Sequence, residues 1–236
     1  MKLIHKIQQN ILHKLLFSSG LRYSELKPSK RMENNQFDFH LDQLIKLGYI
    51  EHIKTLYRLT AKGKDFTNRI DTDDKTQQFQ SKLGVVVIPH RTLKGKDQYL
   101  IYTRLKHPFY GCQGFMSGKV RYGEKIVDTA KRELFEETKL EGTPFLVGIR
   151  HYLVFDEQSG ELVEDKILFF CGVESPTGNL HANNEGKFSW IGEEDFKKSV
   201  INHFESFDVF LEDVDLFRKF DGHVKVVERQ QYTDKY

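Results

Sequence analysis

The segment from Gly118 to Leu140 limits what this chain can fold into more than any other part of the sequence. It contains Glu133, Glu136 and Glu137 at spacings i, i+3 and i+4, and on a helix these positions lie on one face. Three carboxylates on one face repel one another, and the lysines earlier in the helix lie too far back to pair with all of them. A divalent cation would remove the repulsion, and oxygen ligands suit Mg²⁺ or Mn²⁺. The alternative is an acidic helix face exposed to solvent.

The wider spacing of this segment resembles the Nudix box. Gly118 is followed by five residues and Glu124, and seven residues later by the run Arg-Glu-Leu-Phe-Glu-Glu-Thr-Lys-Leu, which begins at Arg132. The defining positions match the family except for Lys139, which stands where the family has glycine. The loop before Gly118 also differs, because it lacks the family's usual Pro-Gly-Gly.

The resemblance implies a Mg²⁺- or Mn²⁺-dependent pyrophosphohydrolase that cleaves a nucleoside diphosphate linked to another moiety. It implies four metal ligands, namely the carbonyl of Gly118 and the side chains of Glu133, Glu136 and Glu137. Glu133 is a metal ligand or the general base, and Arg132 orients Glu124 or Glu133. A further catalytic glutamate often comes from a distant loop in this family, and Glu185 is our candidate; the alternative is an exposed loop carboxylate.

The substrate contacts are less constrained than the metal ligands. Basic residues that we expect to contact phosphate are Arg104, Lys119 and Arg150. Aromatic residues suited to stacking a base are Tyr102, Tyr110, Phe115, Phe169 and Trp190, with burial in the core as the alternative for each. The two cysteines form no disulfide framework, so a reducing cytoplasm is expected.

Beyond residue 82 the pattern is that of strands around one helix. Apolar runs of strand length occur at Gly84–Ile88, Tyr99–Arg104, Leu146–Phe155, Lys166–Val173 and Phe188–Ile191. The strong helix is Glu124–Lys139, and a closing helical region begins near Glu193. This order indicates an α/β (α+β) fold, which the resemblance narrows to an α/β/α sandwich at residues 83–236.

Residues 1–70 have a different pattern, which is mostly helical. The predicted elements are helices up to Phe17, at Tyr23–Leu26 and at Asn34–Leu47, strands at 49–53 and 56–59, and a helix at Ala61–Phe66. Gly48 stands where a glycine cap ends a helix, and Thr60 is a suitable N-cap. The order resembles a small winged helix–turn–helix domain of the MarR and ArsR type.

That resemblance implies a third helix that enters the major groove of double-stranded DNA. The candidate DNA contacts are Lys30, Arg31, Asn34, Asn35, Gln36 and His40. Amides pair with adenine edges and cations with phosphates. The alternative for this domain is contact with protein, including formation of a homodimer.

Charge supports a division of the chain. Residues 1–70 carry 13 lysines and arginines against 6 aspartates and glutamates, whereas residues 71–236 carry 23 against 28. A basic part joined to an acidic part suggests two domains with different partners. The polar stretch at residues 71–82 is the predicted linker.

Two functions follow from this organisation. One is an active hydrolase with an appended winged helix. The other is a transcription regulator whose Nudix domain senses a nucleotide such as ADP-ribose. No segment approaches the roughly 20 apolar residues that a membrane crossing requires, so we expect no membrane partner.

Overall fold

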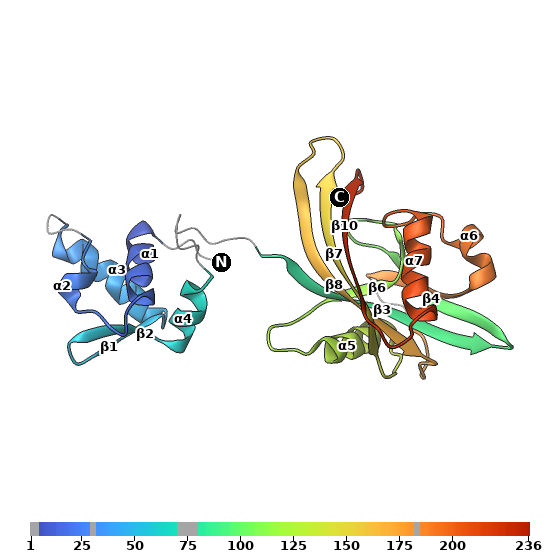
Figure 1. The fold of residues 1–236 in the computed structure, drawn as a ribbon, viewed down its shortest axis with the longest axis horizontal. Coiled ribbons are helices and arrows are strands. Elements are labelled where there is room, and N and C mark those ends of the chain that lie inside the picture. Colours follow the sequence, from blue (N-terminus) through green and yellow to red (C-terminus); the bar gives the residue numbers. More distant parts are fainter. Residues whose placement is uncertain (1–4, 29–31, 70–79, 182–184) are drawn as a thin grey trace. The chain divides into compact units, whose positions relative to one another are not determined.

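The computed structural model describes residues 5–28, 32–69, 80–181 and 185–236. The chain forms two compact units, Met1–Phe79 and Gln80–Tyr236 (Figure 1), which are described separately. Within the described ranges, no helix has the length and apolar character that crossing a membrane requires. The predicted linker falls mostly on residues 70–79, which lie outside the described residues.

The first unit contains the predicted elements in the predicted order. They are α1 (Lys6–Leu16), α2 (Tyr23–Leu26), α3 (Asn34–Lys46), β1 (Ile50–Ile53), β2 (Leu56–Leu59) and α4 (Ala61–Thr67). Apolar residues at helical spacing form its core, including Leu12 and Leu15 of α1 and Phe37 and Leu44 of α3. The strands form an antiparallel hairpin.

Two turn residues of this unit behave as the sequence predicts. Gly48 follows α3 with a φ of 72°, which is the left-handed conformation that glycine adopts without a Cβ clash. The Thr60 hydroxyl accepts a 3.0 Å hydrogen bond from the backbone N–H of Gly63 and so caps α4.

The second unit is a mixed sheet with helices on both faces. Its elements are β3 (Lys82–Leu93), β4 (Lys96–Arg104), β5 (Gln113–Gly114), β6 (Met116–Lys119), α5 (Ile126–Thr138), β7 (Phe145–Asp156), β8 (Leu162–Glu174), β9 (Gly186–Gly192), the 3₁₀ turn η1 (Glu193–Asp195), α6 (Phe196–Ser199), α7 (Phe207–Arg218) and β10 (Lys225–Thr233). The sheet has eight strands in the order β10-β7-β8-β3-β4-β5, with β6 paired to β3 and β9 to β4. The predicted α/β sandwich is confirmed.

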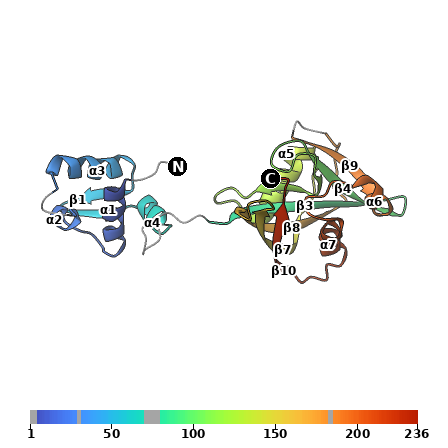
Figure 2. The same ribbon diagram turned by 90° about the horizontal axis from the view of Figure 1, so that it is seen from above.

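Strand β3 shows why the sheet is covered twice. Val85 and Val87 belong to the core under α5, whereas Val86 and Ile88 belong to the core under α7. Successive side chains of a strand point to opposite faces, so a continuous apolar run requires cover on both. Figures 1 and 2 show α5 and α7 on opposite sides of the sheet.

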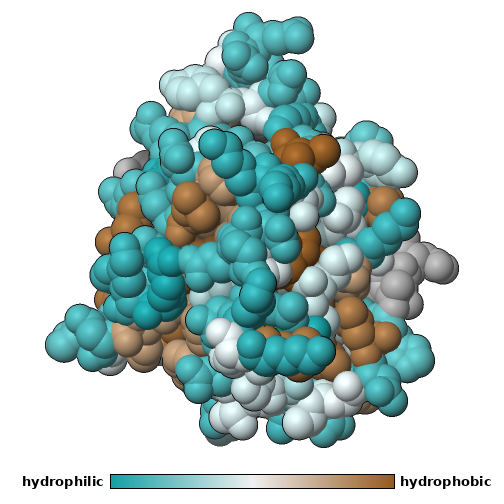
Figure 3. Space-filling model, turned by 90° about the vertical axis from the view of Figure 1, so that its right-hand side faces the viewer, coloured by the Kyte–Doolittle hydropathy of each residue, from teal (hydrophilic) through white to brown (hydrophobic). Residues whose placement is uncertain are grey.

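The end of the chain differs from the prediction of a helical closing region. Helix α7 is followed by β10, which pairs in parallel with β7 from Lys225 opposite Gly148 to Thr233 opposite Asp156. Its residues are mostly polar and exposed, so the apolar pattern that reveals a buried strand is missing. The face of this unit in Figure 3 is mostly hydrophilic, with apolar side chains in separate patches.

Candidate active site

A cavity of about 1010 Å³ lies in the second unit beside β6 and collects most of the predicted site. Its lining includes these predicted residues: Gly118, Glu133, Glu136, Glu137 and Glu185. Helix α5 carries three of them, while Gly118 lies on β6 and Glu185 directly precedes β9. Residues far apart in the sequence therefore meet at one wall of the cavity.

Arg132 organises the carboxylates of α5. Its guanidinium binds both oxygens of Glu124, at 2.7 and 2.9 Å, and donates to Glu133 at 2.6 Å and to Glu136 at 3.0 Å. The same group donates to the backbone carbonyl of Lys119 at 3.1 Å. The expected pairing of Arg132 is thus present with both predicted partners, and it ties the helix to the end of β6.

These contacts shift the pKa of both members of the Arg132–Glu124 pair, in which two hydrogen bonds join the guanidinium to the carboxylate. Hydrogen bonding to Arg132 lowers the pKa of Glu124 to about 2. Hydrogen bonding to Glu124 in turn raises the pKa of Arg132. Both groups are therefore charged over the whole physiological range.

Gly118 is packed directly against Glu133. A Cβ atom placed on Gly118 would lie 1.9 Å from Cδ of Glu133, which is far inside normal contact distance. Gly118 pairs with Val85 in the β3–β6 ladder, so the backbone cannot easily move away. Only glycine leaves room for the carboxylate at this position.

Glu137 experiences the repulsion that the spacing predicts. Burial raises the pKa of Glu137 to about 7, and the charge of Glu133 adds to this, while Lys106 and Arg104 oppose it. A cation bound between these carboxylates would stabilise their ionised forms. Across the described ranges, no three acidic, histidine or cysteine side chains already stand in metal-binding positions. The donor chemistry fits Mg²⁺ or Mn²⁺, and two of the proposed ligands, Glu133 and Glu136, contact Arg132 in this structure.

Glu185 is held near this wall by its backbone. Its carbonyl accepts hydrogen bonds from the N–H of Leu105 at 2.9 Å and from the Tyr102 hydroxyl at 3.0 Å. Its carboxylate pairs with Lys106, a residue that the sequence interpretation did not single out. Lys106 comes just after the end of β4. This place at the end of a predicted strand is the sequence signal that could have identified Lys106 as a site residue.

Helix α5 buries only a narrow part of its apolar surface. Ala130 and Leu134 are fully buried against the sheet, but Val127 and Phe135 are 40% and 45% exposed. The sheet covers only part of the helix surface on which the apolar side chains of α5 lie. Lys139, in place of the family's glycine, keeps the left-handed cap conformation with a φ of 62°.

The predicted phosphate contacts have three different outcomes. Lys119 lines the cavity and is exposed. Arg104 also lines it, but its guanidinium donates to the carbonyls of Lys106 and Pro108 at 2.9 and 2.6 Å, so it braces the loop after β4. Arg150 does not belong to the lining: it is buried and binds Asp213 at 2.5 Å. The expectation for Arg150 is therefore wrong.

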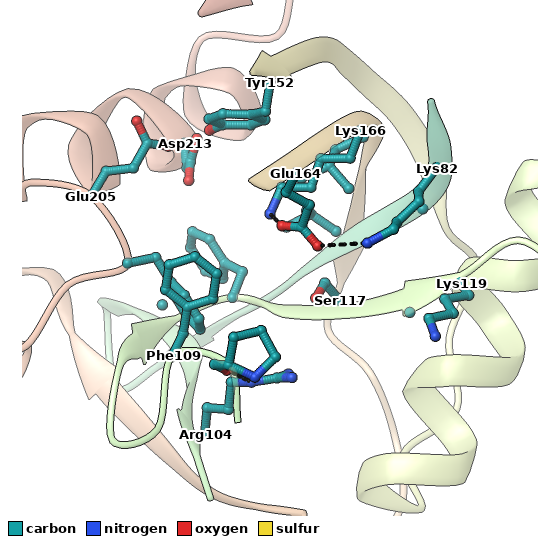
Figure 4. Close-up of a pocket in the computed structure, with 18 of the residues that line it drawn as sticks. Lys82, Arg104, Phe109, Ser117, Lys119, Tyr152, Glu164, Lys166, Glu205 and Asp213 are labelled. Atoms are coloured by element: carbon teal, nitrogen blue, oxygen red, sulfur yellow. Dashed lines mark hydrogen bonds and ion pairs between the residues drawn. The ribbon is translucent and has the colours of Figure 1, made fainter. Parts of the chain in front are cut away.

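Only one of the predicted stacking residues, Phe115, lines the cavity, and it is buried against Phe210. The other four are placed elsewhere in the sheet and loops. Aromatic residues of the lining that the sequence did not reveal are Phe109, Tyr152, Phe170, Phe204, Phe210 and Tyr236. They come from separate elements, as the Phe109 and Tyr152 side chains in Figure 4 illustrate, so no local motif marks them.

The predicted DNA contacts of the first unit also differ in their exposure to solvent. Asn34, Asn35 and Gln36 are exposed at the start of α3, while Lys30 and Arg31 lie outside the described residues. His40 is buried and its ring stacks on His5 with a centroid distance of 4.3 Å. A buried ring cannot reach a base edge, so its assignment as a DNA contact is wrong.

Comparison with known proteins gives the fold a family. The model of the NUDIX domain matches residues 81–210. The NUDIX domain of Shewanella oneidensis NrtR, complexed with ADP ribose, is similar with a TM-score of 0.51 at 14% identity, over 66% of this chain and 96% of that chain. The Mutator MutT protein of Bacillus halodurans is similar with a TM-score of 0.50 at 22% identity, over 66% of this chain and 93% of that chain. At these identities the likeness concerns the fold alone. No curated protein sequence matches the chain significantly.

Proposed function

This chain belongs to the NUDIX domain family, and from that premise we propose that it is a Mg²⁺-dependent pyrophosphohydrolase acting on a nucleoside diphosphate linked to a second moiety. The observation that carries the proposal is the intact set of α5 carboxylates at one wall of a cavity, with Arg132 binding Glu133 and Glu136. Carboxylates gathered on one wall suit a divalent cation and the diphosphate chemistry that such a cation assists.

The metal ligands in this proposal are the Gly118 carbonyl, Glu133, Glu136 and Glu137. When bound, the metal would neutralise phosphate charge and lower the pKa of the attacking water. The residues of the chain supply position and charge. Arg132 holds the ligand-bearing face of α5 at β6, so the carboxylates keep one geometry.

Basic side chains around the wall would attract and orient the diphosphate. Lys119 is exposed at the cavity, and Arg121 lies 3.3 Å from Glu136. Lys106 also lines the cavity, where it pairs with Glu185. A phosphate group in the cavity would meet these cations, and Glu133 or Glu185 would accept the proton of the attacking water.

A turnover assay tests the proposal. The full chain with Mg²⁺ is incubated with a panel of nucleoside diphosphate derivatives, and nucleoside monophosphate release is measured. Glu137→Gln should remove activity by at least 100-fold while thermal unfolding stays close to that of the wild type. Turnover that survives this change would refute the assignment of Glu137 as a metal ligand. The absence of turnover on every derivative would refute the proposed enzymatic function.

The second candidate is a transcription regulator that senses a nucleotide. It is favoured by the first unit, whose element order α1-α2-α3-β1-β2-α4 we interpret as a winged helix–turn–helix that binds DNA through Asn35 and Gln36. The similar NUDIX domain of Shewanella oneidensis NrtR is complexed with ADP ribose, so ADP-ribose is the first ligand to test. Tight binding without hydrolysis would select this candidate.

DNA binding is tested with the full chain and a labelled duplex over a range of salt concentrations. Phosphate contacts predict an affinity that falls steeply as salt rises. Asn35→Ala should weaken binding to a specific site more than binding to random duplex, because base contacts carry the sequence preference. If no duplex is bound even at low salt, the first unit is a protein-contact module.

A further inference from the structure

The end of the cavity away from Lys119 has a chemistry of its own. Figure 4 shows Glu205, Asp213 and Tyr152 gathered on one side of the cavity and Lys119 on the other. Glu205 lies between α6 and α7, Asp213 on α7 and Tyr152 on β7. All three line the same cavity as the α5 glutamates, so the cavity continues from the proposed diphosphate site to these side chains.

The two carboxylates at this end of the cavity, Asp213 and Glu205, differ in their ion-pair partners. Asp213 binds the guanidinium of Arg150 at 2.5 Å, which makes it part of a buried ion pair. Glu205 has a weaker cationic partner, because Arg229 lies 3.9 Å from it and contacts Glu212 at 2.5 Å. Glu205 is therefore the carboxylate with capacity to accept further hydrogen bonds.

The surroundings of Glu205 bury most of its side chain. Its side chain is only 13% exposed, and burial raises its pKa, which a hydrogen bond from Tyr152 and the charge of Arg229 partly counter. Phe109 and Phe210 contribute aromatic surface to the same cavity. A carboxylate in such a place binds N–H or O–H donors strongly and repels phosphate.

We propose that Glu205 is the specificity-determining residue of this site and accepts hydrogen bonds from two adjacent donors on the nucleoside part of the ligand. This inference rests on the proposed function. The donors are the imino and amino groups of a guanine-type base or the two hydroxyls of a ribose. Adenine and cytosine place a ring-nitrogen acceptor beside their amino group, and that acceptor would face the second oxygen of Glu205.

The test uses the full chain with Mg²⁺ and α,β-methylene nucleoside diphosphates, whose P–C–P bridge is not hydrolysed. Calorimetry compares the guanosine, inosine, adenosine and 2′-deoxyguanosine analogues. If the base supplies the donors, the guanosine analogue binds roughly 5- to 150-fold more tightly than the inosine and adenosine analogues. If the ribose supplies them, only the 2′-deoxy analogue is weakened. In both cases Glu205→Gln removes the preference.

Glu212→Gln is the matched control. Glu212 is exposed and pairs with the same Arg229, but it is absent from the cavity lining. The control should keep the wild-type affinities within about twofold, because Glu212 is half-exposed and outside the cavity, where its ion pair with Arg229 and its 3.9 Å contact with Arg150 contribute little. If it reproduces the effect of Glu205→Gln, the effect comes through Arg229 and the proposal is overturned.

The remaining outcomes separate this inference from the proposed function. Equal binding of all four analogues by the wild type overturns the inference even if Glu205→Gln fails to fold. Unchanged preference in a folded Glu205→Gln variant overturns it as well. If the analogues bind with the expected preference but the matching diphosphate substrates are not hydrolysed, the inference stands and the enzymatic function fails. If none of the analogues binds, both fail.

Discussion

Replacing Gly118 by alanine tests how closely the site depends on one missing side chain. The new Cβ would lie 1.9 Å from Cδ of Glu133, whereas carbon atoms in contact are normally about 3.5 Å apart. One of the two must therefore shift by about 1.6 Å. The β3–β6 ladder restrains the backbone at Gly118, so the Glu133 carboxylate is the group expected to shift.

The cost of that shift has two parts. Glu133 would leave its 2.6 Å contact with Arg132, and the extra methyl group would overpack the junction of β6 and α5. Overpacking of this kind destabilises a protein by about 1–3 kcal/mol. A displacement of about 1 Å at a reacting centre lowers activity by about 100-fold, so we expect at least that loss in metal-dependent turnover.

The assays are turnover, Mn²⁺ binding by electron paramagnetic resonance, and thermal unfolding. Gly148→Ala is the control, because its new Cβ would approach only the side-chain end of Leu216, at 3.1 Å, on the opposite face of the sheet. The control should lose stability and keep Mn²⁺ affinity and activity. If Gly118→Ala kept activity and Mn²⁺ affinity within about threefold of the wild type, Glu133 would not belong to the metal site.

Three further changes test the helix that carries the carboxylates. Lys139→Gly should raise the free energy of unfolding by about 0.5 kcal/mol in urea denaturation, because relief of about 1–2 kcal/mol of left-handed strain exceeds the entropy cost of glycine; a less stable variant would contradict this. Leu134→Ala should lower it by about 2–5 kcal/mol, since Leu134 is fully buried, and a loss below 1 kcal/mol would mean that α5 packs loosely. Glu124, whose pKa is lowered to about 2 by Arg132, stabilises the fold above its ordinary pKa of about 4.5. The stability difference between wild type and Glu124→Gln should therefore shrink as the pH falls from about 4.5 to about 2, and a constant difference would exclude the ion pair as its cause.

The DNA hypothesis depends on the surface that α3 presents. The exposed start of α3 carries Asn34, Asn35 and Gln36, but it is followed by the exposed Phe39 and Asp42. An exposed phenylalanine and an acidic residue suit a protein contact better than a phosphate backbone. Binding measurements on duplex therefore decide between the two interpretations of the first unit.

Local spacing determined the part of the site that lies on α5. The i, i+3, i+4 pattern of the glutamates and the position of Arg132 follow from helix geometry, which repeats every 3.6 residues wherever a helix lies. The helices of the first unit were predictable for the same reason, whereas β3 was predictable because a continuous apolar run of strand length marks a strand that is covered on both faces. Periodicity within one segment reports which face of that segment is buried.

Tertiary structure alone decided what faces those carboxylates. Arg150 and His40 look like available polar residues in the sequence, but packing buries both. Glu205 reaches the cavity only because α7 folds back over β7 and β8, and polar β10 becomes a strand by pairing with β7. These placements depend on contacts between distant segments, for which a single segment carries no periodic signal.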